Sequence, residues 1–311
     1  METTSRKAAQ HSKDRRRALM KEKHFWEEWT GRVFTSVCVV FLIVVILSIV
    51  YFVASKGVMT FAKDGVSLSE FFFGTTWSPD GSPAKFGALP FITGSFATTI
   101  LAALIASPLA LCAALFMTEI VPKFGKRLLQ PAIELLSGIP SVIYGFVGLT
   151  VIVPLLRSMF GGQGIGILAG CLVLSVMILP TITSIMADAL SSLPGGLRES
   201  SYALGATRWQ TIYRVVIPTV LPSLLTGVVL GMARAFGEAL AVQMVIGNAP
   251  HVPHSLLESA STLTSVITLS MGNTAMGSAQ NNALWSMALV LLLMTFVFVL
   301  LVRLLERRNR I

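Results

Sequence analysis

The sequence predicts an all-α integral membrane protein with six transmembrane helices, and three observations support this fold class. Hydrophobic residues make up 54% of the 311 residues and charged residues only 13%, whereas a soluble domain averages about 25% charged residues. The apolar residues are gathered into long segments, and most of the basic residues lie beside those segments. Too little polar surface remains for a water-soluble fold, so most of the surface must contact lipid.

Six segments are long and apolar enough to cross a membrane as helices, which takes about 20 residues each. They are 33–55, 91–117, 133–156, 165–186, 221–246 and 283–305. The first contains no charged residue and follows a charged tail of 32 residues. Its apolar run is longer than the core of a secretory signal, which is about 7–15 residues. We therefore interpret it as an uncleaved anchor.

Lysine and arginine are distributed unequally between the two sides of these spans. With the N-terminus in the cytoplasm, the tails and inner loops hold 19 of the 24 basic residues. The outer loops hold only Lys56, Lys63, Lys85 and Arg157, and Arg234 lies inside a span. Because basic residues accumulate on the cytoplasmic side of membrane proteins, we expect both termini there. The net charge of +9 then belongs to membrane flanks and indicates no nucleic-acid partner.

The loop 193–218, between the fourth and fifth spans, is too long and too patterned for a minimal connector. It reads as a short helix that begins after Pro194, followed by a sharp turn at Gly205 and a second amphipathic stretch that ends at Pro218. Glycine is the residue that most often ends a helix with such a turn. Two short helices at an angle form a compact knob, and a knob of this kind fits a groove in another protein.

This loop resembles the cytoplasmic signature of type I binding-protein-dependent ABC importer permeases, which reads E-A-A, three residues, G, nine residues, I-x-L-P. The residues that match it, with both spacings kept, are Glu199, Gly205, Val215, Ile217 and Pro218. The chain departs from it at Ser200 and Ser201, where the family usually has alanine. The resemblance implies the type I importer permease fold. It also implies that the first helix of the loop sits in a cleft of a separate ATPase subunit.

The sequence lacks an energy source of its own. No G-x-x-x-x-G-K-[ST] run occurs, so the loop that cradles nucleotide phosphates in an ATPase is missing. Serine, histidine and acidic residues show no recognisable catalytic spacing, and no metal-binding spacing is present. We therefore expect a non-catalytic permease subunit that binds no cofactor or metal, with ATP and Mg²⁺ held by the partner ATPase.

Span five carries two charged residues, Arg234 and Glu238, in an otherwise uncharged segment. Charges inside a bilayer are costly and usually face protein or water, and the i, i+4 spacing predicts that the two pair on one helical face. Gly227 and Gly231 precede them on the same stripe and predict close helix packing. The pair is either a structural salt bridge or a substrate pathway, in which Arg234 meets an anion and Glu238 orients the guanidinium.

Within the importer permeases, the chain resembles the phosphate-specific pair, and the PstC-type member more than the PstA-type. The segments that carry this resemblance are 73–79, 86–90, 137–145 and 234–238. It implies import of inorganic phosphate through the cytoplasmic (inner) membrane of a prokaryote. It also implies the partners: a PstA-type second permease in a heterodimer, two ATPase subunits, and a periplasmic or lipid-anchored phosphate-binding protein.

The resulting domain organisation has four parts. A basic cytoplasmic tail occupies 1–32, and the first transmembrane helix with its external loop occupies 33–89. The permease domain occupies 90–305, and a short cytoplasmic tail occupies 306–311.

Three alternative functions stay open at this stage. A permease for another oxyanion, such as sulfate or molybdate, would carry the same features. An ion-coupled transporter would have internal inverted repeats, and none is apparent in the sequence. Such a transporter would also have no use for a loop that docks an ATPase. A membrane scaffold that senses phosphate would be unaffected by deletion of residues 199–205, which should abolish ATP-driven uptake in an importer.

Overall fold

The computed structural model describes residues 2–308 and, among these, the side chains of residues 29–301, 303 and 304. The chain forms two compact units, Met1–Ser55 and Lys56–Ile311. Most basic side chains of the two predicted tails therefore lie outside the described side chains. The first unit consists of helix α1, Glu2–Gly57, which extends two residues into the second unit. The predicted first span lies entirely within this helix.

The second unit is built almost entirely from helices. Its elements in chain order are α2 Met59–Ala62, α3 Leu68–Phe73, β1 Trp77–Ser78, β2 Lys85–Phe86, α4 Leu89–Leu115, η1 Phe116–Ile120, α5 Pro122–Gly138, α6 Ser141–Val147, η2 Gly148–Ile152, α7 Val153–Phe160, α8 Ile167–Ser191, α9 Gly195–Ala203, α10 Arg208–Thr211, η3 Ile212–Val216, α11 Ile217–Phe236, α12 Leu240–Val245, α13 Leu263–Ser270, η4 Met271–Asn273 and α14 Ala279–Arg308. Strands β1 and β2 form a short antiparallel hairpin in the segment between the first and second spans.

Six helical segments of the described chain are long and apolar enough to cross a membrane, which confirms the predicted number. They are Trp29–Ala62, Leu89–Ile120, Ser141–Phe160, Ile167–Ser191, Arg208–Phe236 and Ala279–Leu301. The second, fourth and sixth agree with the predicted spans to within a few residues. The third and fifth do not.

The third span begins later than predicted because the helix breaks before Pro140. Ile139 adopts an extended backbone, with φ −70° and ψ 127°, as the ring of a following proline favours. Residues 122–138 therefore form a separate amphipathic helix, α5, and the span begins at Ser141. The hydroxyl of Tyr144 donates a hydrogen bond of 2.6 Å to the carbonyl oxygen of Leu136 across the break, which satisfies one of the carbonyls at the end of α5.

The fifth span lies further toward the N-terminus than predicted. The helix passes through Pro218 without interruption because the preceding turn, η3, is π-helical, and Ile217 donates to the carbonyl of Ile212 five residues earlier. Proline is tolerated at the first positions of the following helix, α11. At its other end α11 stops at Phe236, and three non-helical residues separate it from α12. The span is thus Arg208–Phe236 and not 221–246.

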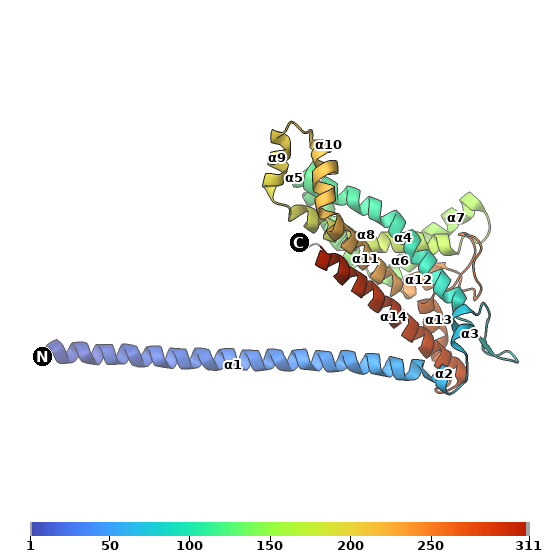
Figure 1. The fold of residues 1–311 in the computed structure, drawn as a ribbon, viewed down its shortest axis with the longest axis horizontal. Helices are drawn as coiled ribbons and strands as arrows, with labels where there is room; N and C mark the ends of the chain where they lie inside the picture. Colours follow the sequence, from blue (N-terminus) through green and yellow to red (C-terminus); the bar gives the residue numbers. More distant parts are fainter. Residues whose placement is uncertain (1, 309–311) are drawn as a thin grey trace. The chain divides into compact units, whose positions relative to one another are not determined.

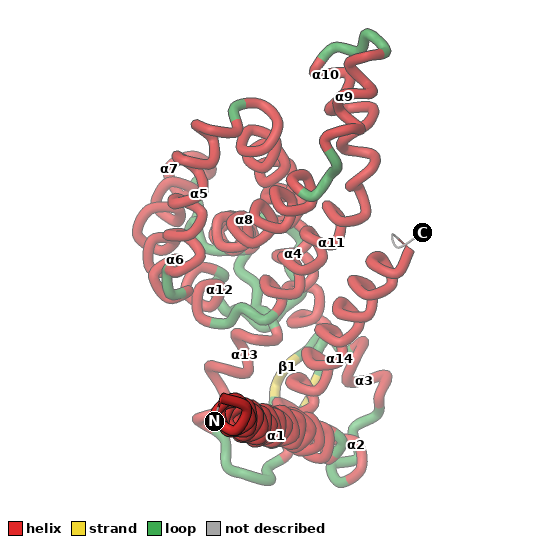
Figure 2. Tube along the Cα trace, turned by 90° about the vertical axis from the view of Figure 1, so that its left-hand side faces the viewer, coloured by secondary structure: helices red, strands yellow, loops and turns green. Residues whose placement is uncertain are grey.

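Helix α8 lies at the centre of the largest hydrophobic cluster (Figure 2). Most of its side chains are buried, as expected of a core helix, although Val176 is exposed. Helix α4 packs on it through four fully buried alanines at four-residue intervals, namely Ala102, Ala106, Ala110 and Ala114. Small side chains at this spacing let two helices approach closely. The sequence therefore encodes the α4–α8 contact as an alanine stripe.

The segment 58–88, between the first and second spans, folds onto one end of the helices of this unit. Phe71 of α3 is fully buried with Phe91 of α4 and Met287 of α14 in a second hydrophobic cluster. The ring of Trp77 in the hairpin contacts Phe91 edge to face, with centroids 5.5 Å apart. At the opposite end of the unit, α9 and α10 project together beyond α8 and α11 (Figures 1 and 2). The two ends of the unit are therefore built differently.

Gly94 in α4 offers a test of this packing. A Cβ atom at this position would collide with the backbone carbonyl oxygen of Ser261, and backbone cannot move aside as a flexible side chain does. We expect Gly94→Ala to destabilise the protein by about 1–3 kcal/mol, measured as a lower Tm in detergent. The control Gly170→Ala introduces the same change where the nearest atom is 3.5 Å away. Equal melting temperatures for the two variants would contradict the close approach.

Candidate functional site

The loop between α8 and α11 has the predicted two-helix form. Helix α9 ends at Ala203, and Gly205 turns the chain with a positive φ of 81°. Thr207 then begins α10 with a capping box, in which its hydroxyl accepts from the N–H of Gln210 and the side chain of Gln210 accepts from the N–H of Thr207. Such reciprocal bonds satisfy two of the free donors at a helix start. The turn is thus fixed by local hydrogen bonds.

The residues at the positions of the importer signature, both matching and departing, divide into exposed and buried groups. Glu199 and Ser200 lie on the exposed face of α9, and Pro218 is exposed on α11. Val215 and Ile217 are half-buried. Ser201 is buried, and its hydroxyl lies 2.9 Å from the hydroxyl of Thr211 in α10. The small residue at position 201 is therefore required where the two short helices cross.

Five large hydrophobic side chains of this loop are exposed, and three of them are more than 60% exposed. Leu204, at the end of α9, is 90% exposed, and Trp209 and Tyr213 are 64% and 65% exposed. Exposed apolar surface of this kind is available for contact with another molecule. The signature does not include these positions, so the sequence analysis missed them. They could have been found because Leu204 and Trp209 are large apolar residues next to the predicted turn at Gly205, in an otherwise polar stretch.

Two arginines of the loop contact the end of the second span. Arg198 of α9 forms an ion pair with Glu119, and Arg208 of α10 donates to the backbone carbonyls of Glu119 and Ile120. None of these contacts was predicted. The sequence did contain a signal for them. Glu119 is an acidic residue at the end of an otherwise apolar span, and the loop predicted on the same side of the membrane carries arginines.

The predicted glycine stripe of span five packs against α8. A Cβ atom on Gly231 would lie 2.6 Å from Cγ1 of Ile182, and one on Gly227 would lie 3.1 Å from Cγ2 of Ile185. These distances leave no space for a larger residue at 231. Both glycines therefore lie where α11 approaches α8 most closely, which is the packing role that their spacing predicts.

Arg234 and Glu238 do not pair, so the predicted salt bridge is wrong. Nη1 of Arg234 donates to the hydroxyl of Thr181 in α8 at 2.7 Å, and the arginine side chain is exposed. Glu238 lies beyond the end of α11, where Oε1 accepts from the N–H of Ala241 at 3.0 Å. The ion pairs formed by the described residues do not include these two. The i, i+4 relation holds only within a continuous helix, and the helix ends at Phe236.

Glu238 borders a polar cavity among α4, α8, α11, α12 and the start of α13, and this cavity is too narrow to hold a water molecule. Most of its polar lining consists of hydroxyl groups, from Ser95, Thr98, Thr99, Thr262 and Thr264. Several of these hydroxyls are already used: that of Thr264 donates to the carbonyl of Glu238 at 2.7 Å, and that of Ser95 accepts from the N–H of Leu263 at 2.9 Å. The hydroxyls of the cavity thus hold the backbone around Glu238 in place.

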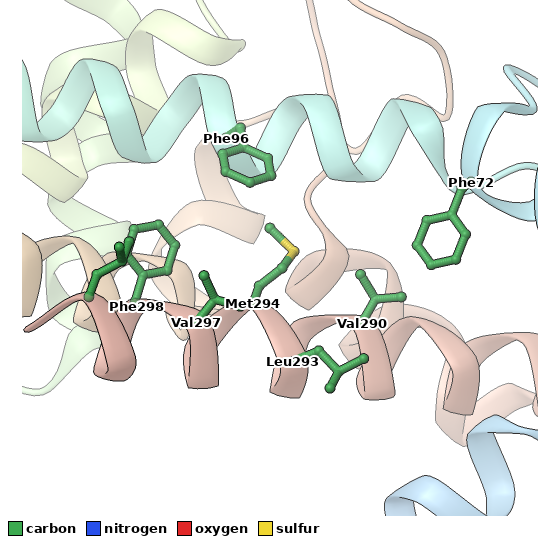
Figure 3. Close-up of a pocket in the computed structure, with 8 residues that line it drawn as sticks. Phe72, Phe96, Val290, Leu293, Met294, Val297 and Phe298 are labelled. Atoms are coloured by element: carbon green, nitrogen blue, oxygen red, sulfur yellow. The ribbon is translucent and has the colours of Figure 1, made fainter. Parts of the chain in front are cut away.

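A larger pocket of about 450 Å³ lies between α4 and α14. Figure 3 shows its lining: Phe96 on α4 faces Met294, Val297 and Phe298 on α14. All its lining residues are hydrophobic, so it offers no side-chain hydrogen-bond donor to an anion. Because it lies between two spans and contains only apolar side chains, it is not part of a polar pathway.

Two histidines and an acid gather in the segment between α12 and α13. Nε2 of His251 lies 2.8 Å from Oε1 of Glu258, and the N–H of His254 donates to Oε2 at 2.8 Å. The backbone hydrogen bond, followed by the contact with His251, lowers the pKa of the Glu258 carboxyl below its ordinary value. The described residues contain no group of three or more side chains that would hold a metal ion. The cluster thus braces a loop.

The sequence is similar to those of membrane subunits of known transporters. Residues 108–311 match the family described as binding-protein-dependent transport system inner membrane component. The chain is 57% identical over 286 residues to the probable ABC transporter permease protein YqgH of Bacillus subtilis, covering 92% of this chain and 93% of that protein. It is 34% identical over 293 residues to the phosphate transport system permease protein PstC of Xylella fastidiosa, covering 88% of each.

Solved structures share the fold. The chain aligns with a chain of a bacterial alginate ABC transporter with a TM-score of 0.62 at 18% identity, covering 91% of this chain and 97% of that one. It aligns with a chain of the MetNI methionine ABC transporter with a TM-score of 0.51 at 23% identity, covering 68% of this chain and 93% of that one. The predicted fold class is therefore confirmed. The chain belongs to the family of binding-protein-dependent transport system inner membrane components, and it is a multi-pass inner-membrane protein.

Proposed function

We propose that this chain is the PstC-type permease subunit of an ATP-driven importer of inorganic phosphate. The observation that carries the proposal is the similarity to phosphate transport system permease proteins, which extends over most of both chains. Arg234 supports it, since a guanidinium presents a planar fork of donors that suits a tetrahedral oxyanion. In this proposal the chain itself catalyses no reaction and binds no cofactor. ATP and Mg²⁺ bind to the separate ATPase subunits, which hydrolyse the ATP.

The proposed assembly places a PstA-type permease beside this chain. Two ATPase subunits lie on the cytoplasmic side, where α9 and α10 project, and a periplasmic or lipid-anchored binding protein delivers phosphate to the opposite side. Both termini then lie in the cytoplasm, in agreement with the distribution of lysine and arginine. The exposed Leu204, Trp209 and Tyr213 support an ATPase contact at the loop, because each presents apolar surface to solvent.

The two charged residues of the fifth span have separate roles in this proposal. Arg234 holds Thr181 through one nitrogen, and a guanidinium has five N–H donors, so others remain to meet a passing anion. Glu238 organises the hydroxyl-lined cavity and the start of α12 through its own backbone and side chain. It acts as a structural neighbour of the pathway and does not orient Arg234.

The direct test is reconstitution of the complete importer in liposomes, with the binding protein added outside. We expect ATP-dependent uptake of labelled phosphate and ATP hydrolysis that rises when phosphate is supplied. Excess unlabelled phosphate should compete, whereas sulfate and molybdate should not. Uptake of sulfate or molybdate in place of phosphate would assign another oxyanion. Phosphate uptake without ATP would indicate an ion-coupled transporter. Absence of uptake for every anion would indicate a membrane scaffold that transports nothing.

Arg234→Gln should reduce phosphate uptake by about two orders of magnitude or more, since the anion loses its charged partner inside the membrane. The complex should still assemble, because Arg234 is exposed and makes a single side-chain contact with Thr181. Uptake in proteoliposomes and co-purification of the ATPase are the two measurements. Arg157→Gln, which removes an exposed arginine at the end of α7, is the matched control. Normal uptake by Arg234→Gln would contradict the pathway role.

Leu204→Asp should weaken binding of the ATPase subunit by at least about tenfold, because a buried carboxylate at an apolar contact is costly. The fold should be unaffected, because the side chain is 90% exposed. Co-purification of the ATPase at graded detergent and salt concentrations measures the loss. Leu256→Asp, a change of another exposed leucine between α12 and α13, should retain the ATPase. Unchanged binding by Leu204→Asp would place the ATPase contact elsewhere.

A further inference from the structure

We propose that the ion pair between Arg198 and Glu119 is the joint through which the loop α9–α10 moves the second span. This inference rests on the proposed function, because it assumes that an ATPase pulls on the loop. The sequence connects the loop directly only to α8 and α11. The contacts of Arg198 and Arg208 connect it to α4 as well.

The ion pair joins a buried carboxylate to a half-buried arginine, and it uses both Nε and Nη2 of the guanidinium. Glu119 is 7% exposed and Arg198 is 22% exposed. Nη2 of Arg198 lies 2.5 Å from Oε1 of Glu119, and Nε lies 3.1 and 3.3 Å from the two carboxylate oxygens. A fork-to-carboxylate contact fixes direction as well as distance. Helix α9 therefore cannot rotate or withdraw without moving Glu119.

Arg198 also holds the end of α8. Its Nη2 donates to the carbonyl of Leu190 at 2.9 Å, and Nη1 donates to the carbonyl of Leu193 at 3.1 Å. A cation at this position is stabilised by the free carbonyls and the dipole at the C-terminus of the helix. One side chain on α9 thus joins the ends of two spans, through a carboxylate on one and backbone carbonyls on the other.

Helix α10 reinforces the same joint. Nη2 of Arg208 donates to the backbone carbonyl of Glu119 and, at 2.7 Å, to that of Ile120. The hydroxyl contact between Ser201 and Thr211 keeps α9 and α10 together. Both short helices therefore hold the C-terminal end of the second span through separate arginines.

The far end of this span reaches the polar cavity. Helix α4 supplies Ser95, Thr98 and Thr99 to the cavity that Glu238 borders, and it continues through η1 to Glu119. The turn η1 is π-helical, a form found mostly as single turns at functional positions. A displacement of α9 is therefore carried by Arg198 to the inner end of α4, and along that helix to the hydroxyl cluster. Glu119 and Arg198 are positioning residues, since they lie at the end of the span away from the cavity.

The test uses the complete reconstituted importer and measures phosphate imported per ATP hydrolysed. Glu119→Gln keeps the shape of the side chain and removes its charge, and Arg198→Lys keeps the charge and removes the fork. We expect each variant to retain the ATPase on co-purification and to hydrolyse ATP, while the ratio of uptake to hydrolysis falls about tenfold. Arg127→Gln, which removes an exposed arginine on α5, should leave the ratio unchanged.

A third variant separates a joint from a merely structural contact. The double change Glu119→Gln with Arg198→Gln leaves no unpaired buried charge, so folding should recover, yet the ratio should stay low. A wild-type ratio in any assembled variant would overturn the proposal, and failure of all three to assemble would assign the pair to folding and overturn it equally. Absence of phosphate import by the wild-type complex would instead contradict the proposed function. The same ratio would then be measured with the oxyanion that is imported.

Discussion

The close packing of small residues against α8 is the contact on which the second unit depends. Four buried alanines bring α4 to one side of α8, and Gly227 and Gly231 bring α11 to it at another position. Helices in lipid gain little from hydrophobic burial, so association rests on van der Waals contact and hydrogen bonds, which require close approach. The positions of Arg234 beside Thr181, and of α9 beyond the end of α8, follow from this packing. Larger residues on these stripes would separate the spans and with them the polar groups.

Breaks in the spans determine where polar groups gather. Ile139 and Pro140 separate α5 from α6, and the three residues after Phe236 separate α11 from α12. Backbone groups released by such breaks cannot be left to lipid, and here they are satisfied from within the chain. Tyr144 donates to one freed carbonyl, and Thr264 donates to the carbonyl of Glu238. The same breaks place a carboxylate beside a group of hydroxyls, so irregular backbone and polar cavity have one cause.

The loop 193–218 illustrates what periodicity and spacing can predict and what they cannot. Gly205 and the small residue at 201 were identifiable because a positive φ and a helix crossing each restrict the residue type. The exposed Leu204 and the bonds from Arg198 and Arg208 to Glu119 were not, since the partners of an ion pair can lie far apart in the chain, here 79 residues for Arg198. The prediction of a salt bridge between Arg234 and Glu238 was wrong for a related reason. Spacing predicts a shared helical face only while the helix continues, and Gly237 ends it.

By itself, the sequence determined the number of spans, the two-helix form of the loop 193–218 and the membership of an importer permease family. These are properties of composition, local spacing and short motifs, which act within a few turns of the chain. The tertiary structure decided which charged groups meet, where the third and fifth spans begin, and that α9 is joined to α4 as well as to its neighbours in sequence. Those outcomes depend on contacts between distant segments, and on competition among partners for each buried donor and acceptor.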